Sequence, residues 1–239
     1  ERGTASALFN SAQYMAVVLF TPLMAWLTHA LGWEHVFLWM GALGLVLSVF
    51  WFALYREPHS DKRLSSKELD YMREGGALVD LELNRKEKKN KAKWAEIKQL
   101  FTSRTLWAIY LGQYCITALT YFFITWFPTY LVTERGFSLK SLGTLGTIPA
   151  IASIVGGWIG GLTSDALYRR GWSLTAARKT CIVGGMLMSS SISLSVFTDN
   201  TYAMLAFFSL AYASLAFAGA SIWCLPADVA PTPAHVASI

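Results

Sequence analysis

Three polar side chains share one face of the first apolar segment of the chain. Asn10, Gln13 and Tyr14 lie at i, i+3 and i+4 spacing, which places them on the same side of a helix. An amide that faces hydrocarbon costs free energy, so these groups are expected to face protein or a water-filled cavity. Two interpretations follow for Gln13: its amide contacts a polar ligand, or it hydrogen-bonds a neighbouring helix and stabilises the bundle.

Two later apolar segments contain the other candidate ligand-binding residues. Gln113 and Tyr121 are eight residues apart, which keeps them within about 80° of each other on a helix of 3.6 residues per turn, and Tyr114 follows Gln113 directly. Ser221 and Trp223 lie near the end of the last apolar segment. For Gln113 and the tyrosines the alternative is a packed aromatic face with one satisfied amide, and for Trp223 it is a position at the membrane interface.

The apolar segments lack the residues that other chemistries require. No Asp, Glu, Lys, Arg or His lies deep in any of them. A membrane-embedded enzyme needs a nucleophile–base pair or a metal cluster at that depth, so we predict no enzyme, no metal site and no cofactor. Cys115, Cys181 and Cys224 have neither pairing nor metal-ligand spacing and are interpreted as packing residues. The net charge of +5 comes from bases in loops, without a basic helix interleaved with stacking aromatics, so no nucleic-acid partner is expected.

Long apolar segments must position these residues. The chain is 54% hydrophobic and 15% charged, whereas a soluble domain has roughly 25% charged residues. Crossing the hydrocarbon core takes about 20 apolar residues in a helix, and lipid offers no partner to an open sheet edge. The sequence therefore predicts an all-α protein in a lipid bilayer. Its six spans are Ala5 to His29, His35 to Tyr55, Leu106 to Val132, Leu142 to Thr163, Thr180 to Phe197, and Tyr202 to Leu225.

Basic residues predict the orientation of these spans. When the loops are numbered alternately, one side holds eighteen Lys and Arg residues and the other holds only Arg135 and Lys140. Cytoplasmic loops have the excess of bases, so both ends of the sequence and the long loop Arg56 to Arg104 are expected in the cytoplasm. In that loop, Ser65 and Glu68 form a capping box that begins a short helix, which Gly75-Gly76 ends. Apolar residues at helical spacing from Trp94 to Phe101 predict an amphipathic helix on the membrane surface.

Several local strings stand in order along the chain. They are Glu1-Arg2-Gly3 with Phe9-Asn10-Ser11-Ala12-Gln13-Tyr14, Gly32-Trp33-Glu34-His35-Val36-Phe37, Thr125-Trp126-Phe127-Pro128-Thr129-Tyr130-Leu131, Gly160-Gly161 with Ser164-Asp165 and Arg169-Arg170-Gly171, Ala177-Arg178-Lys179, and Asp228-Val229-Ala230-Pro231. In this order they resemble the anion:cation symporter branch of the major facilitator superfamily. Within that branch the chain is most similar to bacterial glucarate and galactarate transporters, with galactonate and hexuronate transporters close behind.

The resemblance implies a fragment of a twelve-helix transporter, comprising helices five to ten. Residues 1–56 would be the last two helices of the N-terminal bundle, 57–104 the cytoplasmic loop, and 105–239 the first four helices of the C-terminal bundle. It further implies a location in the inner (plasma) membrane and import of a sugar acid by proton symport and alternating access. The group that binds the coupling proton, and the base that attracts the anion, would lie in the missing N-terminal helices. The alternatives are a different coupling ion and a subunit that does not transport.

The same resemblance assigns roles to individual residues. A sugar acid presents a carboxylate and a row of hydroxyls, and the branch places a sugar-contacting amide at Gln13 and a tryptophan against the sugar at Trp223. The loop after the fourth span resembles the superfamily's signature motif, which holds the cytoplasmic gate closed. Without the resemblance, that loop shows an acid among bases near a helix end, where a surface salt bridge is weak. The run Gly156 to Gly161 predicts close helix packing. The motif residues are Gly161, Asp165, Arg169, Arg170 and Arg178.

Overall fold

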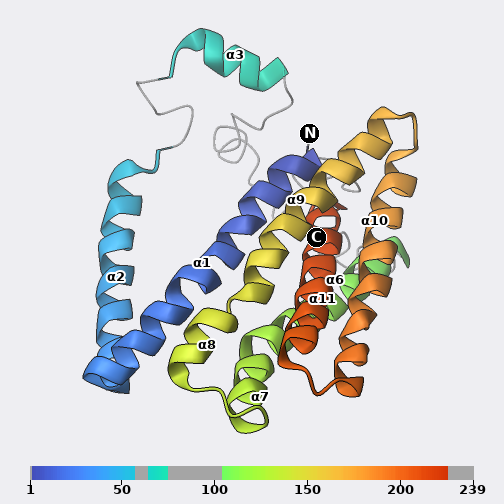
Figure 1. Cartoon of the computed structure of the whole chain (residues 1–239). Coiled ribbons are helices and arrows are strands. Elements are labelled where there is room, and N and C mark those ends of the chain that lie inside the picture. Colours follow the sequence, from blue (N-terminus) through green and yellow to red (C-terminus); the bar gives the residue numbers. More distant parts are fainter. Residues whose placement is uncertain (1, 57–63, 75–103, 226–239) are drawn as a thin grey trace.

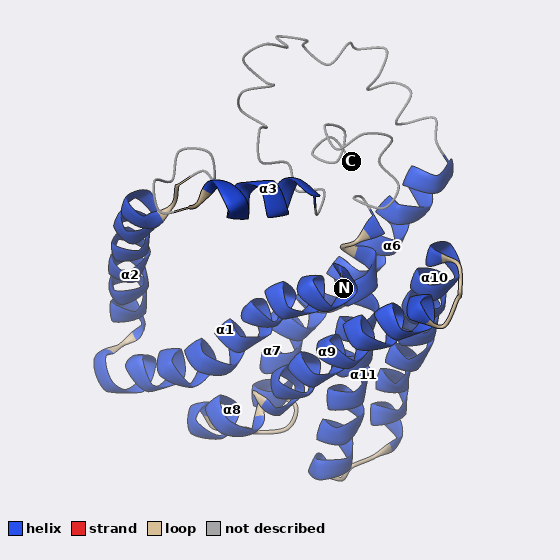
Figure 2. Ribbon diagram, turned by 90° about the horizontal axis from the view of Figure 1, so that it is seen from above, coloured by secondary structure: helices blue, strands red, loops and turns tan. Residues whose placement is uncertain are grey.

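The computed structural model describes residues 2–56, 64–74 and 104–225, and within these ranges the regular elements are helices, with no strand (Figures 1 and 2). The elements are α1 (Arg2–Leu31), α2 (Trp33–Leu54), α3 (Ser66–Glu74), α6 (Arg104–Tyr121), the π-helical turn η1 (Phe122–Trp126), α7 (Phe127–Thr133), α8 (Leu139–Leu145), α9 (Ile148–Arg169), α10 (Leu174–Ser189), the 3₁₀ helix η2 (Ser190–Phe197) and α11 (Thr201–Ile222).

Six helical segments of the described chain are long and apolar enough to cross a membrane, as the sequence predicts. Two of them extend further than expected. The fourth span runs to Arg169 and the fifth begins at Leu174, whereas the predicted spans ended at Thr163 and began at Thr180. The connection between them is therefore short, and charged residues assigned to a loop by the sequence lie on helices.

Local sequence explains where these helices begin. The side chains of Ser138, Ser173 and Asn200 each accept a hydrogen bond from a backbone N–H of the first turn, at the starts of α8, α10 and α11. Gly32 separates α1 from α2 and Gly171 separates α9 from α10, with φ angles of 93° and 89°. Glycine adopts such positive φ values without the steric cost of a Cβ, which permits the abrupt reversals.

The third span changes its helical form near Pro128. The backbone N–H of Phe127 bonds to the carbonyl of Phe122, five residues earlier, so one π-helical turn separates α6 from α7. Pro128 lacks an N–H and cannot complete the α-helical pattern to residue 124. Such turns often occur at functional sites, and this one places Phe123 in the core two positions after Tyr121.

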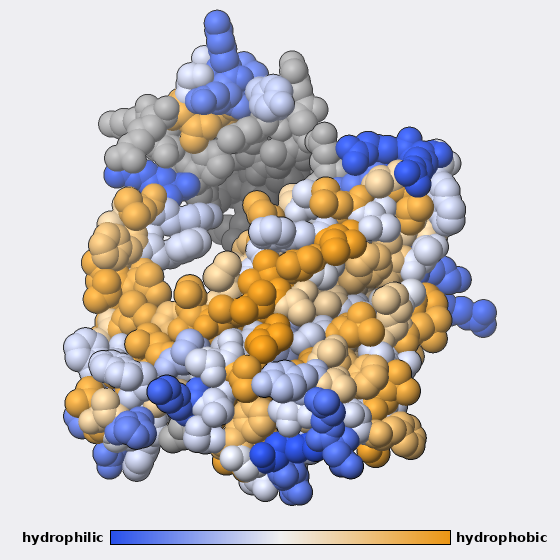
Figure 3. All heavy atoms as spheres, in the orientation of Figure 1, coloured by the Kyte–Doolittle hydropathy of each residue, from blue (hydrophilic) through white to orange (hydrophobic). Residues whose placement is uncertain are grey.

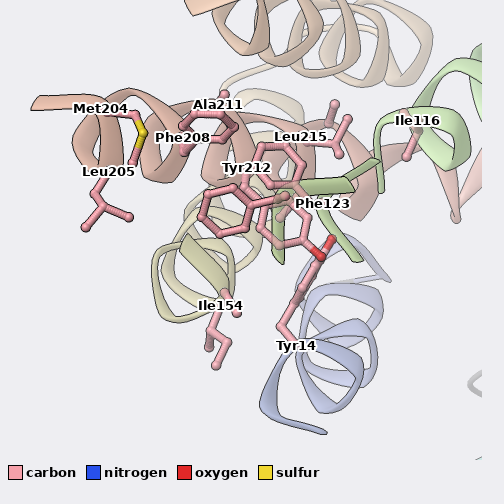
Figure 4. Packing of buried hydrophobic residues seen from close by; sticks show 14 of the residues in the cluster. Tyr14, Ile116, Phe123, Ile154, Met204, Leu205, Phe208, Ala211, Tyr212 and Leu215 are labelled. Atoms are coloured by element: carbon pink, nitrogen blue, oxygen red, sulfur yellow. The ribbon is translucent and has the colours of Figure 1, made fainter. Parts of the chain in front are cut away.

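The last four spans, from α6 to α11, form one group, which we call the four-span group. Helix α11 lies at its centre and packs against α9, α10, η2 and α6. Aromatic residues of η1, α7 and α11 meet there. The Phe123 ring of η1 stacks on Tyr212 of α11 with 4.2 Å between centroids (Figure 4). The Phe127 ring of α7 lies 4.8 Å from that of Phe208. Glycines bring α9 and α11 into contact, because a Cβ on Gly156 or Gly160 would overlap the α11 backbone. This confirms the close packing predicted from the glycine run.

Helix α1 crosses this four-span group, whereas α2 packs against α1 and lies to one side (Figure 1). No side chain of α2 is buried. Hydrophobic residues cover the middle of the face in Figure 3, and hydrophilic residues gather mainly toward its upper and lower ends. This pattern fits helices that cross a membrane.

The first helix of the long loop begins as predicted. Glu68 accepts a hydrogen bond from the Ser65 backbone N–H at 3.0 Å, and Ser65 Oγ accepts one from the Glu68 N–H at 3.3 Å. These two bonds are the reciprocal pair of a capping box at the start of α3. The proposed glycine stop at Gly75-Gly76 and the amphipathic helix around Trp94 to Phe101 lie outside the described residues.

Candidate functional site

A cavity of about 320 Å³ lies where α1 faces the four-span group. Helices α1, α6, α9 and α11 and the turn η1 all contribute to its wall. Its wall includes one glycine, Gly157, and several polar or aromatic side chains. These side chains are Asn10, Gln13, Tyr14, Gln113, Thr117, Thr120, Tyr121, Ser153 and Trp223. Within the described part of the chain, no Asp, Glu, Lys, Arg or His lines the cavity.

Most of the predicted ligand-binding residues meet at this cavity. Those that line it are Asn10, Gln13, Tyr14, Gln113, Tyr121 and Trp223. Tyr114 does not, because it is one position past Gln113, about 100° further round α6, and its side chain is 70% exposed. Ser221 does not either: it is completely buried inside the four-span group, while its neighbours Gly219 and Ala220 line the cavity.

The cavity amides differ in their hydrogen bonding. Asn10 donates its Nδ2 proton to the Ser6 carbonyl at 3.0 Å, on the preceding turn of its own helix. Gln113 Nε2 lies 3.3 Å from Thr117 Oγ1, also one turn away. Gln13 makes no hydrogen bond to any residue that the structure describes. Its amide therefore retains both its donors and its acceptor for a solute in the cavity.

Aromatic rings pack against Tyr14, which lines the cavity. Tyr14 is 9% exposed and meets Tyr212 edge to face, with 5.4 Å between ring centroids. Tyr212 in turn stacks on Phe123, so the three rings connect α1, α11 and η1 (Figure 4). Tyr14 thus packs α1 against the four-span group as well as lining the cavity.

Sequence reasoning overlooked the small hydroxyl residues of the wall. Thr117 and Thr120 continue the Gln113 face of α6 at i+4 and i+7, and Ser153 faces them from α9. The signal was present in the helical spacing from Gln113 for the two threonines. Ser153 has no such signal, because a lone serine in an apolar helix commonly bonds its own backbone.

A second cluster, of polar residues, joins the Arg2 end of α1 to the four-span group. Asp165 on α9 accepts hydrogen bonds from the Gly3 N–H at 3.2 Å, the Thr4 N–H at 2.9 Å and the Thr4 hydroxyl at 2.8 Å. Both N–H groups belong to the backbone of α1, so the carboxylate of α9 bonds a neighbouring helix directly. The carboxylate is 5% exposed, so it stabilises this contact inside the protein.

Arg178 on α10 supports the carboxylate from the other side. Its Nη1 lies 3.5 Å from Asp165 Oδ1 and donates to Ser164 Oγ at 2.8 Å, and the residue is 3% exposed. The weak surface salt bridge expected from the residues alone is wrong, because α9 and α10 extend past these charges and enclose them. Arg169 and Arg170, predicted in the same motif, are exposed and pair with no described residue. Gly161 instead allows α9 to approach α1 closely, because a Cβ there would lie 2.6 Å from the Gly3 carbonyl oxygen.

The whole of residues 1–239 matches the sequence profile of the Major Facilitator Superfamily. The chain belongs to this superfamily. It is 46% identical over 231 residues to a probable galactarate/D-glucarate transporter of Bacillus subtilis, covering 97% of this chain and 50% of that protein. A probable galactarate/D-glucarate transporter of Escherichia coli is 46% identical over 97% of this chain and 52% of its own length. A D-galactonate transporter of E. coli is 36% identical over 97% of this chain and 54% of that protein.

The match confirms the predicted superfamily. The chain spans about half the length of the curated relatives it matches.

Proposed function

We propose that the whole protein imports a sugar acid of the galactarate/glucarate type, with the cavity as part of its binding site. The observation that supports this most directly is the position of Gln13 and Gln113, which line one cavity from opposite halves. Amides and hydroxyls on both walls suit a ligand with several hydroxyl groups. The names of the most similar relatives support the same substrate class.

Alternating access is the transport mechanism that we propose. Helix α1 contacts the four-span group at both ends: Gly3 meets Gly161 at one end, and Pro22 meets Gly143 at the other. The cavity residues of α1 lie between these contacts. A ligand would reach them when the halves separate at one end while the other end stays in contact, which is the rocking motion of paired bundles.

Proton symport and cytoplasmic ends are further parts of the proposal. The described residues place no titratable acid or base at the cavity wall. We therefore assign the coupling proton and the base for the carboxylate to helices beyond the present sequence. The excess of Lys and Arg in the loops at one side supports a cytoplasmic position for both ends. Import of galactonate or a hexuronate is the second candidate, favoured by the similarity to a D-galactonate transporter.

Uptake of labelled galactarate and glucarate by cells that express the full-length protein tests the proposal. Unlabelled galactonate and a hexuronate serve as competitors. Gln13→Ala and Gln113→Ala should each weaken apparent affinity while the protein stays inserted, because a lost hydrogen bond to a polar ligand costs about 1–3 kcal/mol. Unchanged affinity in both variants would reassign the amides to helix packing. Competition stronger for galactonate than for galactarate would favour the second candidate.

A further inference from the structure

Thr117 differs from the neighbouring hydroxyl residues of the cavity wall. Thr120 donates to the Ile116 carbonyl at 2.9 Å and Ser153 donates to the Pro149 carbonyl at 2.9 Å. Each of these hydroxyls is satisfied by its own helix, four residues back, as is common in apolar helices. Thr117 makes no such bond to the described backbone. Its hydroxyl contacts the Gln113 amide alone, at 3.3 Å.

We propose that Thr117 is a specificity-determining residue, which forms with Gln113 a paired site for one hydroxyl group of the sugar-acid carbon chain. The inference rests on the proposed function and adds the part of the substrate that this wall recognises. Both side chains line the cavity and lie one helical turn apart on the same face of α6.

The chemistry of the pair does not depend on which way the amide points. If Gln113 donates to Thr117, the amide oxygen remains as an acceptor and the threonine hydroxyl proton remains as a donor. If Thr117 donates instead, the amide protons remain as donors and the threonine oxygen keeps a free lone pair. In both arrangements the pair offers at least one donor and one acceptor to the cavity.

A donor beside an acceptor complements an alcohol, which both donates and accepts one proton. A carboxylate has acceptor oxygens only, so it would leave the acceptor of the pair facing a negative oxygen. A plain methylene would leave both polar groups without partners, which costs free energy in a buried site. The pair therefore favours a hydroxylated carbon over either alternative.

The rest of the described wall fits this division of the ligand. Asn10 donates its amide proton to the Ser6 carbonyl, which leaves its oxygen as an acceptor that a ligand hydroxyl can donate to. No charged side chain of the described residues lines the cavity to neutralise a carboxylate. This wall therefore suits the hydroxyl-bearing middle of a sugar acid, with the carboxylates placed elsewhere.

Binding to the purified full-length protein tests the inference with two six-carbon dicarboxylates. Galactarate has four hydroxyls between its carboxylates and adipate has none. Thr117→Val keeps the shape of the side chain and removes its hydroxyl, and Thr117→Ser restores a hydroxyl. Thr129→Val is the matched control, because it removes a hydroxyl of the same span that bonds its own helix at 3.0 Å and lies outside the cavity. Labelled galactarate gives Kd directly, and adipate is measured as its competitor.

Thr117→Val should raise the Kd for galactarate about tenfold and leave adipate competition within twofold of wild type. Thr117→Ser and Thr129→Val should both stay within about threefold of wild type for galactarate. Equal losses for both dicarboxylates, an unchanged galactarate Kd in Thr117→Val, or an equal loss in Thr129→Val would each overturn the inference. A wild-type protein that binds no sugar acid would refute the proposed function itself, and the inference with it.

Discussion

Replacing Gly161 with alanine should push the two halves apart at the Asp165 end. An added Cβ would lie 2.6 Å from the Gly3 carbonyl oxygen and 2.8 Å from the Ala7 Cβ, whereas ordinary contact begins at 3.4 Å. Gly3 is backbone and cannot rotate away, so α1 and α9 must separate by about 0.8 Å to remove the overlap. The Gly3 N–H already lies 3.2 Å from Asp165 Oδ1, and this separation would break that bond.

The cost of this movement decides how far the conformational equilibrium shifts. Overpacking of a close contact costs about 1–3 kcal/mol, which corresponds to a shift of roughly 5- to 150-fold between two conformations. In the proposed alternating-access cycle the contact forms only while this end is closed, so Gly161→Ala should favour the conformation that is open there. Substrate uptake should slow, because the protein returns less often to the conformation closed at this end.

Spin labels on exposed residues at this end would measure the shift in full-length protein. Ala5 on α1 and Tyr168 on α9 are both exposed, and double electron–electron resonance between labels there should show a larger share of long distances in Gly161→Ala. Gly184→Ala is the matched control, since a Cβ there meets nothing within 4 Å and the change in helix propensity is the same. Identical distance distributions in wild type and Gly161→Ala would refute the reasoning.

Two other predictions concern coupling and topology. Asp165→Asn and Asp228→Asn in the full-length protein should each alter transport rate or assembly and leave substrate-induced proton uptake intact, because we assign the coupling acid to other helices. Loss of substrate-induced alkalinisation with binding retained in either variant would place the coupling site in this half. A cysteine at Arg135 should react with an impermeant reagent in intact cells, and a cysteine at Lys88 should not. The reverse labelling pattern would invert the proposed topology.

The helical spacing of polar residues predicted much of the cavity, and the reason lies in the solvent. In an apolar helix each amide must find a polar environment, so Gln13 and Gln113 indicate the inward faces of α1 and α6. Tyr114 and Ser221 show where this reasoning ends. Tyrosine tolerates the membrane interface and serine bonds its own backbone, so neither residue type reveals which face it occupies.

Burial of the Asp165 cluster could not be predicted from the sequence, for a different reason. Asp165 and Arg178 lie near helix ends, where hydropathy alone cannot separate a loop charge from an enclosed one. The partner that makes burial tolerable is the first turn of α1, more than 160 positions earlier in the chain. Backbone N–H groups leave no mark in a sequence, so a carboxylate that binds them is found only when the two helices are placed together.

The two sites share helix faces, and this links them mechanically. On α9, Ser153, Gly157 and Gly161 follow at intervals of four: the first two line the cavity, and the third contacts α1. On α1, Gly3 meets α9, while Ala7 lies four residues on and borders the cavity. A rigid helix cannot withdraw its first turn from Asp165 without moving the residues one and two turns further along. Opening the contact at Gly3 must therefore change the cavity wall formed by α1, so under the proposed mechanism ligand binding would depend on closure of this end.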